Sequence, residues 1–182
     1  MLSGMTNELD LIRRCGLGEA AALDALYVQH GERVWRLCVR MTGNQTEAED
    51  LSQEVWLAVF QKIGGFRCES AFSTWLYRVT VNAYLQRRRQ APPEDVISPD
   101  EMATDQRSSS EEHLAANERA ARLRAAVAAL PETLRSALLL RVNEELSYAA
   151  IAEVLGCTSA AAKMRIARAR AMLAGAVAEE DR

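Results

Sequence analysis

Residues 147–170 read SYAAIAEVLGCTSAAAKMRIARAR, and this stretch decides the fold class. A serine opens a short helical run, and Gly156 follows at the position where a left-handed residue commonly closes a helix. Thr158 can cap a second helix, and residues 159–173 carry four basic side chains and no acid. A short helix, a glycine turn and a basic second helix are the parts of a helix-turn-helix, whose second helix lies in the major groove of DNA.

One face of the second helix is predicted to contact DNA. Four side chains at steps of one, four and five residues share it: Lys163, Met164, Ala167 and Arg168. Ile166 and Leu173 lie seven residues apart on another face and can pack inward. A solvated, arginine-rich helix in a bundle is the alternative, but no glutamate stands at four-residue spacing to balance these charges.

The remaining sequence predicts an all-α protein. The chain has 182 residues, of which 49% are hydrophobic and 26% charged, the balance of a folded globular protein. Apolar residues recur at three- and four-residue steps almost throughout, without a convincing alternating run. We expect helices at 8–14, 19–41, 46–62 with Thr46 as its cap, 73–89, 118–130, 132–142, 147–155 and 158–174.

Residues 91–117 differ from their surroundings. They contain three prolines, a run of three serines, and seven acids against one arginine. This composition is typical of a flexible acidic linker. We therefore expect two small helical domains, at 1–90 and 118–175, joined by a linker at 91–117 and followed by a short tail at 176–182.

A second basic region ends the first domain. Residues 78–90 carry four arginines and no acid, and they follow the sequence FRCESAFSTW at 66–75. Aromatic and arginine side chains in a loop beside a basic helix can hold unstacked bases, because stacking is worth about 1–3 kcal/mol per base. Individually, Phe72, Trp75 and Tyr77 are more typical of a core.

Other classes of site and location are disfavoured. The four cysteines lack zinc spacing, neither histidine has a glutamate three residues before it, and no glycine-rich phosphate loop is present. We therefore expect no metal, no cofactor and no enzymatic activity. No apolar run is long enough to span a bilayer, and the N-terminus lacks signal-peptide features, so we expect a cytoplasmic protein without membrane insertion.

Three motifs in series resemble the extracytoplasmic-function sigma factors of bacterial RNA polymerase. They are DLSQEVW at 50–56, FRxxxAFxTWLYRVxxN at 66–82, and LPE at 130–132 followed by LSYxxIA at 146–152 and KxRxxRAR at 163–170. The resemblance covers residues 8–90 and 118–175. It implies an all-α fold with a region 2 bundle and a region 4 helix-turn-helix.

The resemblance also implies partners. Region 2 would bind the clamp of core RNA polymerase and the minus-ten promoter element, and region 4 would bind the flap and the minus-thirty-five element. An anti-sigma factor would regulate the protein. The two elements lie about 85 Å apart at about 3.4 Å per base pair, so we expect the linker to be drawn out on the polymerase. The acidic pI of about 5.5 is an average over basic and acidic surfaces of the same chain. It suggests weak promoter binding by the free protein.

The family motifs assign site residues by position. Those that would face the clamp are Asp50, Gln53 and Glu54. Those that would contact the melted minus-ten strand form a base-capture loop and its neighbours: Phe66, Arg67, Cys68, Glu69, Ser70, Ala71, Phe72, Ser73, Arg78 and Asn82. Those that would bind the minus-thirty-five duplex are Arg141, Lys163, Met164, Arg165, Ala167 and Arg168.

Departures from the family pattern leave some questions open. Ala160, Ala161 and Ala162 replace the usual Gly, Thr and Val, and Met164 stands where Ser is common, so the promoter sequence is not predicted. Cys68 replaces a frequent Gly, and a redox role for its thiol stays open. A stand-alone helix-turn-helix regulator is the alternative function, although it would leave the first domain without a role.

Overall fold

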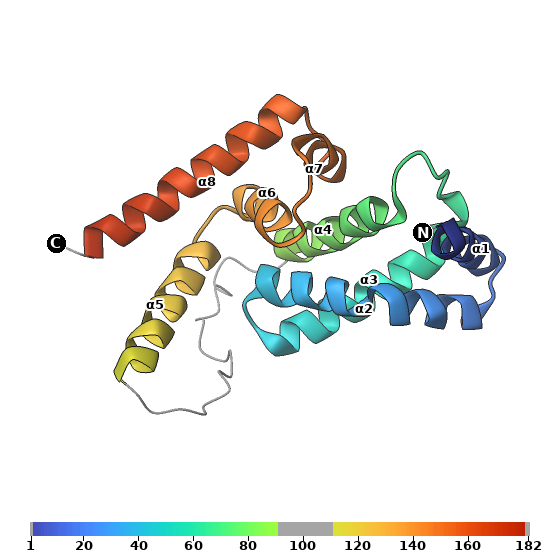
Figure 1. Cartoon of the computed structure of the whole chain (residues 1–182), viewed down its shortest axis with the longest axis horizontal. Coiled ribbons are helices and arrows are strands. Elements are labelled where there is room, and N and C mark those ends of the chain that lie inside the picture. Colours follow the sequence, from blue (N-terminus) through green and yellow to red (C-terminus); the bar gives the residue numbers. More distant parts are fainter. Residues whose placement is uncertain (1, 91–110, 181–182) are drawn as a thin grey trace.

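The structure is a computed structural model that describes residues 2–90 and 111–180, with side chains described at 8–90 and 119–175. Within these ranges the chain forms α-helices and one 3-10 turn, and no strand, which confirms the all-α prediction (Figure 1). The elements are α1 (Leu2–Gly16), α2 (Ala20–Thr42), α3 (Gln45–Lys62), η1 (Ile63–Gly65), α4 (Phe72–Gln90), α5 (Glu111–Ala128), α6 (Glu132–Asn143), α7 (Tyr148–Val154) and α8 (Ser159–Glu180).

Four predicted boundaries are wrong. Helix α1 begins at Leu2, whereas the predicted helix began at residue 8. The Asn44 side chain, rather than Thr46, caps α3, since it has extended backbone angles and accepts a hydrogen bond from the Glu47 amide at 3.0 Å. Helix α5 begins at Glu111, so residues 111–117 of the predicted linker are helical, while 91–110 lie outside the described residues. Helix α8 continues to Glu180, so most of the predicted tail is helical.

Helices α1–α4 form the N-terminal bundle. The inward faces of α2, α3 and α4 carry fully buried side chains, among them Leu26, Leu51 and Val81. Helix α1 packs on α2 and on η1. This contact is close, because a Cβ atom built on Gly16 would lie 3.1 Å from the Cα of Gly64. Glycine at both positions lets α1 approach the turn that precedes the 66–71 loop.

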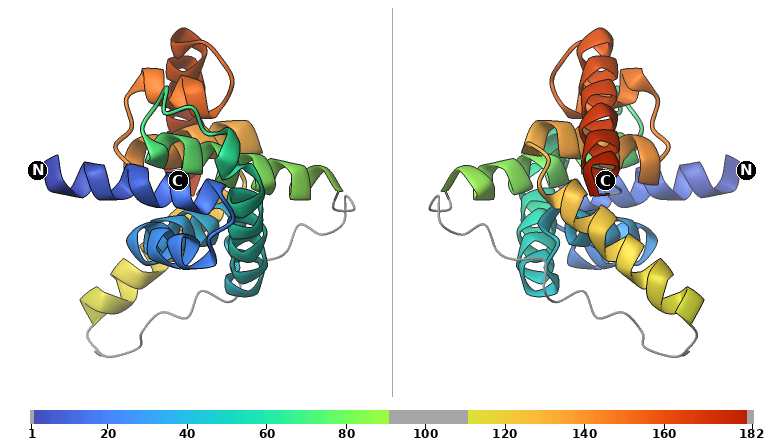
Figure 2. Two further views of the ribbon diagram at one scale, coloured as in Figure 1. Left: turned by 90° about the vertical axis from the view of Figure 1, so that its right-hand side faces the viewer. Right: turned by 90° about the vertical axis from the view of Figure 1, so that its left-hand side faces the viewer.

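Helices α5–α8 form the C-terminal bundle. Helix α8 packs on α5, α6 and α7, and its contact side chain Ile166 is 2% exposed. Leu140 of α6 and Ile151 of α7 are fully buried in the same core. Helix α6 lies between α8 and α2 (Figures 1 and 2). The C-terminal bundle thus presents α8 outward and α6 toward the N-terminal bundle.

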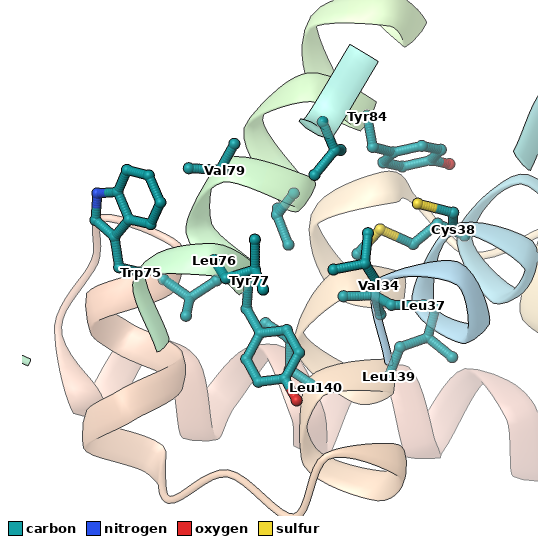
Figure 3. Packing of buried hydrophobic residues seen from close by; sticks show 14 of the residues in the cluster. Val34, Leu37, Cys38, Trp75, Leu76, Tyr77, Val79, Tyr84, Leu139 and Leu140 are labelled. Atoms are coloured by element: carbon teal, nitrogen blue, oxygen red, sulfur yellow. The ribbon is translucent and has the colours of Figure 1, made fainter. Parts of the chain in front are cut away.

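The two bundles share one buried cluster. Helix α6 packs on α2, and α7 packs on α4. Figure 3 shows the side chains of α2, α4 and α6 that meet there, including Val34 and Leu37, Leu76 and Tyr77, and Leu139 and Leu140. The two predicted domains are therefore not separated in this structure, because they bury apolar surface against each other.

Candidate functional site

The helix-turn-helix forms through the predicted caps. The Ser147 hydroxyl accepts a hydrogen bond from the Ala150 amide at 3.1 Å, and the Thr158 hydroxyl accepts one from the Ala161 amide at 3.2 Å. Gly156 lies between them with φ +58°. Each hydroxyl accepts a hydrogen bond from a backbone amide in the first turn, which has no partner within its own helix. Local chemistry therefore fixes the turn that orients α8.

Gly156→Ala is expected to lower the free energy of unfolding by about 1–2 kcal/mol, because an L-residue pays that cost in the left-handed region. No atom lies within 4 Å of a Cβ built on Gly156, so the cost is conformational and not steric. Urea unfolding measures it. Gly65→Ala is the matched control, since it also meets open space but does not have a positive φ. An unchanged stability for Gly156→Ala would mean that the turn relaxes into another conformation.

The predicted recognition face is exposed on α8. Lys163, Met164, Ala167 and Arg168 are all exposed, and Arg165 is half-buried. Within the described part of the chain, no ion pair involves any of these three cations. The face therefore presents to solvent positive charges that no carboxylate neutralises. Such charges favour binding to a phosphate backbone.

Arg141 differs from the other predicted contacts of the upstream element. Its Nη1 donates a hydrogen bond to the Leu146 carbonyl at 2.8 Å, and its guanidinium lies 5.1 Å from the centre of the Tyr148 ring. A cation held over an aromatic ring stabilises that geometry. In this structure Arg141 therefore stabilises the segment at 146–148 that leads into α7.

The 66–71 loop connects η1 to α4. Arg67, Cys68, Glu69 and Ala71 are exposed, whereas Ser70 and Ser73 are half-buried. Cys68 has φ +55°, a conformation that favours glycine. Half of the predicted loop residues at 66–73 are therefore open to solvent.

Phe72 does not have the exposure that a base contact needs. It is 3% exposed and stacks on Trp75 with ring centres 5.6 Å apart. The half-buried Phe66 ring packs against both, with ring centres 5.7 Å from Phe72 and 5.5 Å from Trp75. In this structure Phe72 supports the loop from beneath, and Phe66 is the aromatic side chain at its surface.

A pocket of about 140 Å³, here named the loop pocket, lies under this loop. Its lining comprises Gly65, Phe66, Arg67, Glu69, Ser70, Trp75, Arg78 and Glu153. Arg78 of α4 lines this pocket together with residues of the loop. Asn82 lies apart from it and lines a separate groove of about 300 Å³ between α3 and α4, together with Glu54 and Gln86. Glu153 comes from α7, and the sequence pattern gave no indication that it would lie here.

The predicted clamp-facing residues lie on one exposed face of α3. Asp50, Gln53 and Glu54 are all exposed there. Arg87 of α4 bridges the two carboxylates, with its guanidinium nitrogens 3.1 Å from Asp50 and 3.1 Å from Glu54. Leu57, 64% exposed and one turn further along, adds an apolar side chain to this face. Sequence reasoning missed Leu57, although its steps of three and four residues from Glu54 and Gln53 could have indicated it.

The Cys38 thiol and the Tyr84 hydroxyl are buried titratable groups of the N-terminal bundle. Burial raises the pKa of the Cys38 thiol to about 12. Burial also raises the pKa of the Tyr84 hydroxyl, an effect that the nearby Arg135 guanidinium opposes. Cys68 is the exposed thiol of the four. Among the described residues there is no cluster of three or more side chains suited to a metal, and none of the helices is long and apolar enough to cross a bilayer.

Two family models match the two bundles. Sigma-70 region 2 matches residues 26–92, and sigma-70 region 4 matches residues 120–173. The RNA polymerase sigma-H factor of Pseudomonas aeruginosa is 35% identical over 178 residues, covering 91% of this chain and 92% of that protein. The ECF RNA polymerase sigma-E factor of Haemophilus influenzae is 33% identical over 173 residues, covering 90% and 91%.

Solved structures share the fold. CnrH in complex with the cytosolic domain of CnrY has a TM-score of 0.69 at 22% identity, covering 95% of this chain and 98% of that one. RpoE in complex with the anti-sigma factor NepR from Bartonella quintana has a TM-score of 0.68 at 20% identity, covering 85% and 95%. With both family models matched in order and relatives above 30% identity along almost the whole chain, this protein belongs to the sigma-70 family, as an extracytoplasmic-function (ECF) sigma factor.

Proposed function

We propose that the protein converts core RNA polymerase into a holoenzyme that starts transcription at specific promoters. The observation that carries this function is that one chain holds three separate surfaces: the cationic face of α8, the aromatic and basic loop pocket, and the acidic face of α3. A stand-alone helix-turn-helix regulator needs only the first of them. The region 2 match to residues 26–92 also favours the sigma factor.

The α8 face binds the minus-thirty-five duplex. Lys163 and Arg168 are exposed and lie five residues apart, a little over one turn, so both can reach a major groove that admits a helix. Met164 and Ala167 stand between them and offer apolar contacts to thymine methyl groups. Arg165, half-buried at the edge of the face, contacts the phosphate backbone.

The loop pocket takes a base of the melted minus-ten strand. Phe66 offers a ring for stacking, and Arg67 and Arg78 neutralise the adjoining phosphates. The energy of holding the base there offsets part of the few kcal/mol needed to unstack it. Asn82, in its separate groove, contacts the duplex next to the melted strand.

The α3 face binds the polymerase clamp. Asp50, Gln53 and Glu54 supply acceptors for basic side chains, and Leu57 supplies an apolar contact at the centre of such a surface. The protein contributes no bond-making chemistry in this mechanism, and it works where the polymerase works, in the cytoplasm. The relationship to sigma factors solved with anti-sigma factors suggests the same kind of inhibitor here.

Transcription from a randomised promoter library tests the function. Core polymerase with this protein is expected to give discrete start sites whose upstream DNA shares two sequence blocks, while core polymerase alone gives none. Failure to bind core polymerase, with sequence-specific DNA binding by the free protein, would favour the stand-alone regulator.

Replacing both Asp50 and Glu54 with alanine is expected to weaken binding to core polymerase about fivefold or more, because each carboxylate lost removes a charge from the interface. Equilibrium titration of labelled protein with core polymerase measures the change. Glu49→Ala is the control, since Glu49 is an exposed acid on the same helix. Equal weakening by the control would show that only net charge matters.

A further inference from the structure

A buried histidine of α2 is bonded to α1. The His30 side chain is 10% exposed, and its Nε2 lies 2.9 Å from Oε1 of Glu8, whose side chain is 30% exposed. A carboxylate only accepts hydrogen bonds, so Nε2 carries the proton and donates. The other ring nitrogen, Nδ1, is buried and has no hydrogen-bond partner among the described residues. Glu8 is therefore the acceptor on which the orientation of this ring depends.

Packing alone does not explain a histidine at this place. A buried polar atom without a partner costs free energy, and an apolar side chain of similar size would avoid that cost. Without Glu8, both nitrogens of the His30 ring would lack a partner, and the ring would turn toward water to regain hydrogen bonds. The bond to Glu8 therefore keeps the ring turned inward.

The His30 ring packs on the aromatic cluster beneath the loop pocket. Its centre lies 5.2 Å from that of Phe72, in an edge-to-face arrangement. Phe72 in turn contacts the rings of Phe66 and Trp75, which line the pocket. Among the ring contacts in the described part of the chain, the one from His30 ties this cluster to another helix. Edge-to-face pairs depend on ring orientation, so a turn of the His30 ring would change the support of Phe72.

Helix α1 is also held in place by apolar contacts that do not involve Glu8. Leu11, Ile12 and Cys15 are 6%, 5% and 1% exposed, so α1 stays packed on α2 when Glu8 is replaced. Loss of the Glu8 carboxylate therefore frees the His30 ring without detaching the helix. A role in positioning the ring can thus be separated from a role in holding α1.

We propose that Glu8 and His30 are positioning residues for the capture of a base. Their hydrogen bond fixes the His30 ring, and the ring holds Phe72 in place beneath the loop pocket. Neither side chain lines the pocket, so both act through Phe72. The inference rests on the proposed function, which assigns the pocket to a base of the melted minus-ten strand. It adds Glu8, which lies outside the residues matched by the region 2 model, to the side chains that determine this pocket.

Hydrogen exchange of the free, full-length chain, resolved by NMR, tests the positioning. The amides of Phe66 and Trp75 report on the two ends of the loop, because each donates a backbone hydrogen bond there. Glu8→Ala is expected to speed exchange at both amides about three- to tenfold, the equivalent of one lost hydrogen bond. Glu8→Gln keeps an oxygen acceptor for Nε2 of His30, so it is expected to exchange like the wild type.

Asp10→Ala is the matched control for this experiment. It removes an acid from the same helix, but Asp10 pairs with Arg13 and Arg14 of α1 instead of with α2. We expect it to leave both loop amides unchanged. A rate in Glu8→Ala that matches the wild type overturns the proposal, as does a rate in Glu8→Gln as fast as that in Glu8→Ala. Equal acceleration at the Cys15 amide also overturns it, because α1 would then have detached as a whole.

Holoenzyme binding to two DNA probes tests the consequence for base capture. One probe is the non-template single strand across the minus-ten block of a promoter that the holoenzyme transcribes, and the other is a duplex with the minus-thirty-five block alone. Glu8→Ala is expected to weaken binding of the strand about three- to tenfold and to leave the duplex unchanged, while Glu8→Gln restores the strand. Unchanged binding of the strand, or an equal loss on both probes, overturns the proposal. The exchange measurement needs neither DNA nor polymerase, so failure of the positioning is separable from failure of the proposed function.

Discussion

Replacing Ile166 with alanine is expected to lower the free energy of unfolding by about 2–5 kcal/mol, since the side chain is 2% exposed and its loss leaves a cavity where α8 meets α6 and α7. Urea unfolding followed by circular dichroism measures the change, and the slope of the transition should stay constant. The recognition face of α8 depends on this packing for its orientation, so promoter binding should weaken in parallel.

Met164→Ala is the matched control for Ile166→Ala. Met164 lies two residues earlier on the same helix but is 53% exposed, so its loss should change stability by no more than about 0.5 kcal/mol. A similar loss in both variants would contradict the assignment of Ile166 to the core of the C-terminal bundle.

Arg168→Ala is expected to weaken holoenzyme binding to its promoter by about 1–3 kcal/mol and to relax specificity at one position of the upstream element. The reason is that Arg168 is exposed on the α8 face, without an ion pair among the described residues, and can bond a base edge in the major groove. Binding to a set of promoters that differ at single upstream positions measures both effects.

Arg119→Ala is the control for that experiment, because it removes an exposed arginine from α5 instead of α8. If Arg168→Ala weakens binding to every promoter equally, Arg168 contacts a phosphate and not a base. The slope of affinity against salt concentration would then fall by about one.

The helix-turn-helix was predictable because its determinants are local. Ser147, Gly156 and Thr158 act on residues no more than five positions away, and the inward side of α8 follows from its three- and four-residue steps. The start of α5 was missed for the opposite reason. Acids and serines are typical of linkers, and they gave no sign that residues 111–117 continue a helix.

Contacts between distant helices could not be predicted from spacing. Arg87 belonged to a basic run that suggested DNA, yet its partners are Asp50 and Glu54, more than thirty positions away. Arg135 was one more arginine in a predicted helix, and its burial depends on contacts with α2 and α4. Residues 135–140 of α6 are buried in succession, so spacing in the sequence does not indicate which of its sides meets which bundle.

Helix α1 is linked to both ends of the 66–71 loop, directly at the first end and through His30 of α2 at the second. At the first end, the close approach of Gly16 and Gly64 fixes η1. At the second, Glu8 of α1 lies 2.9 Å from the His30 ring, whose centre is 5.2 Å from that of Phe72. The loop is therefore a six-residue link between η1, which packs on α1, and Phe72, which packs on His30. A change in loop length would therefore disturb one of these two contacts, although neither is made by an exposed residue of the loop.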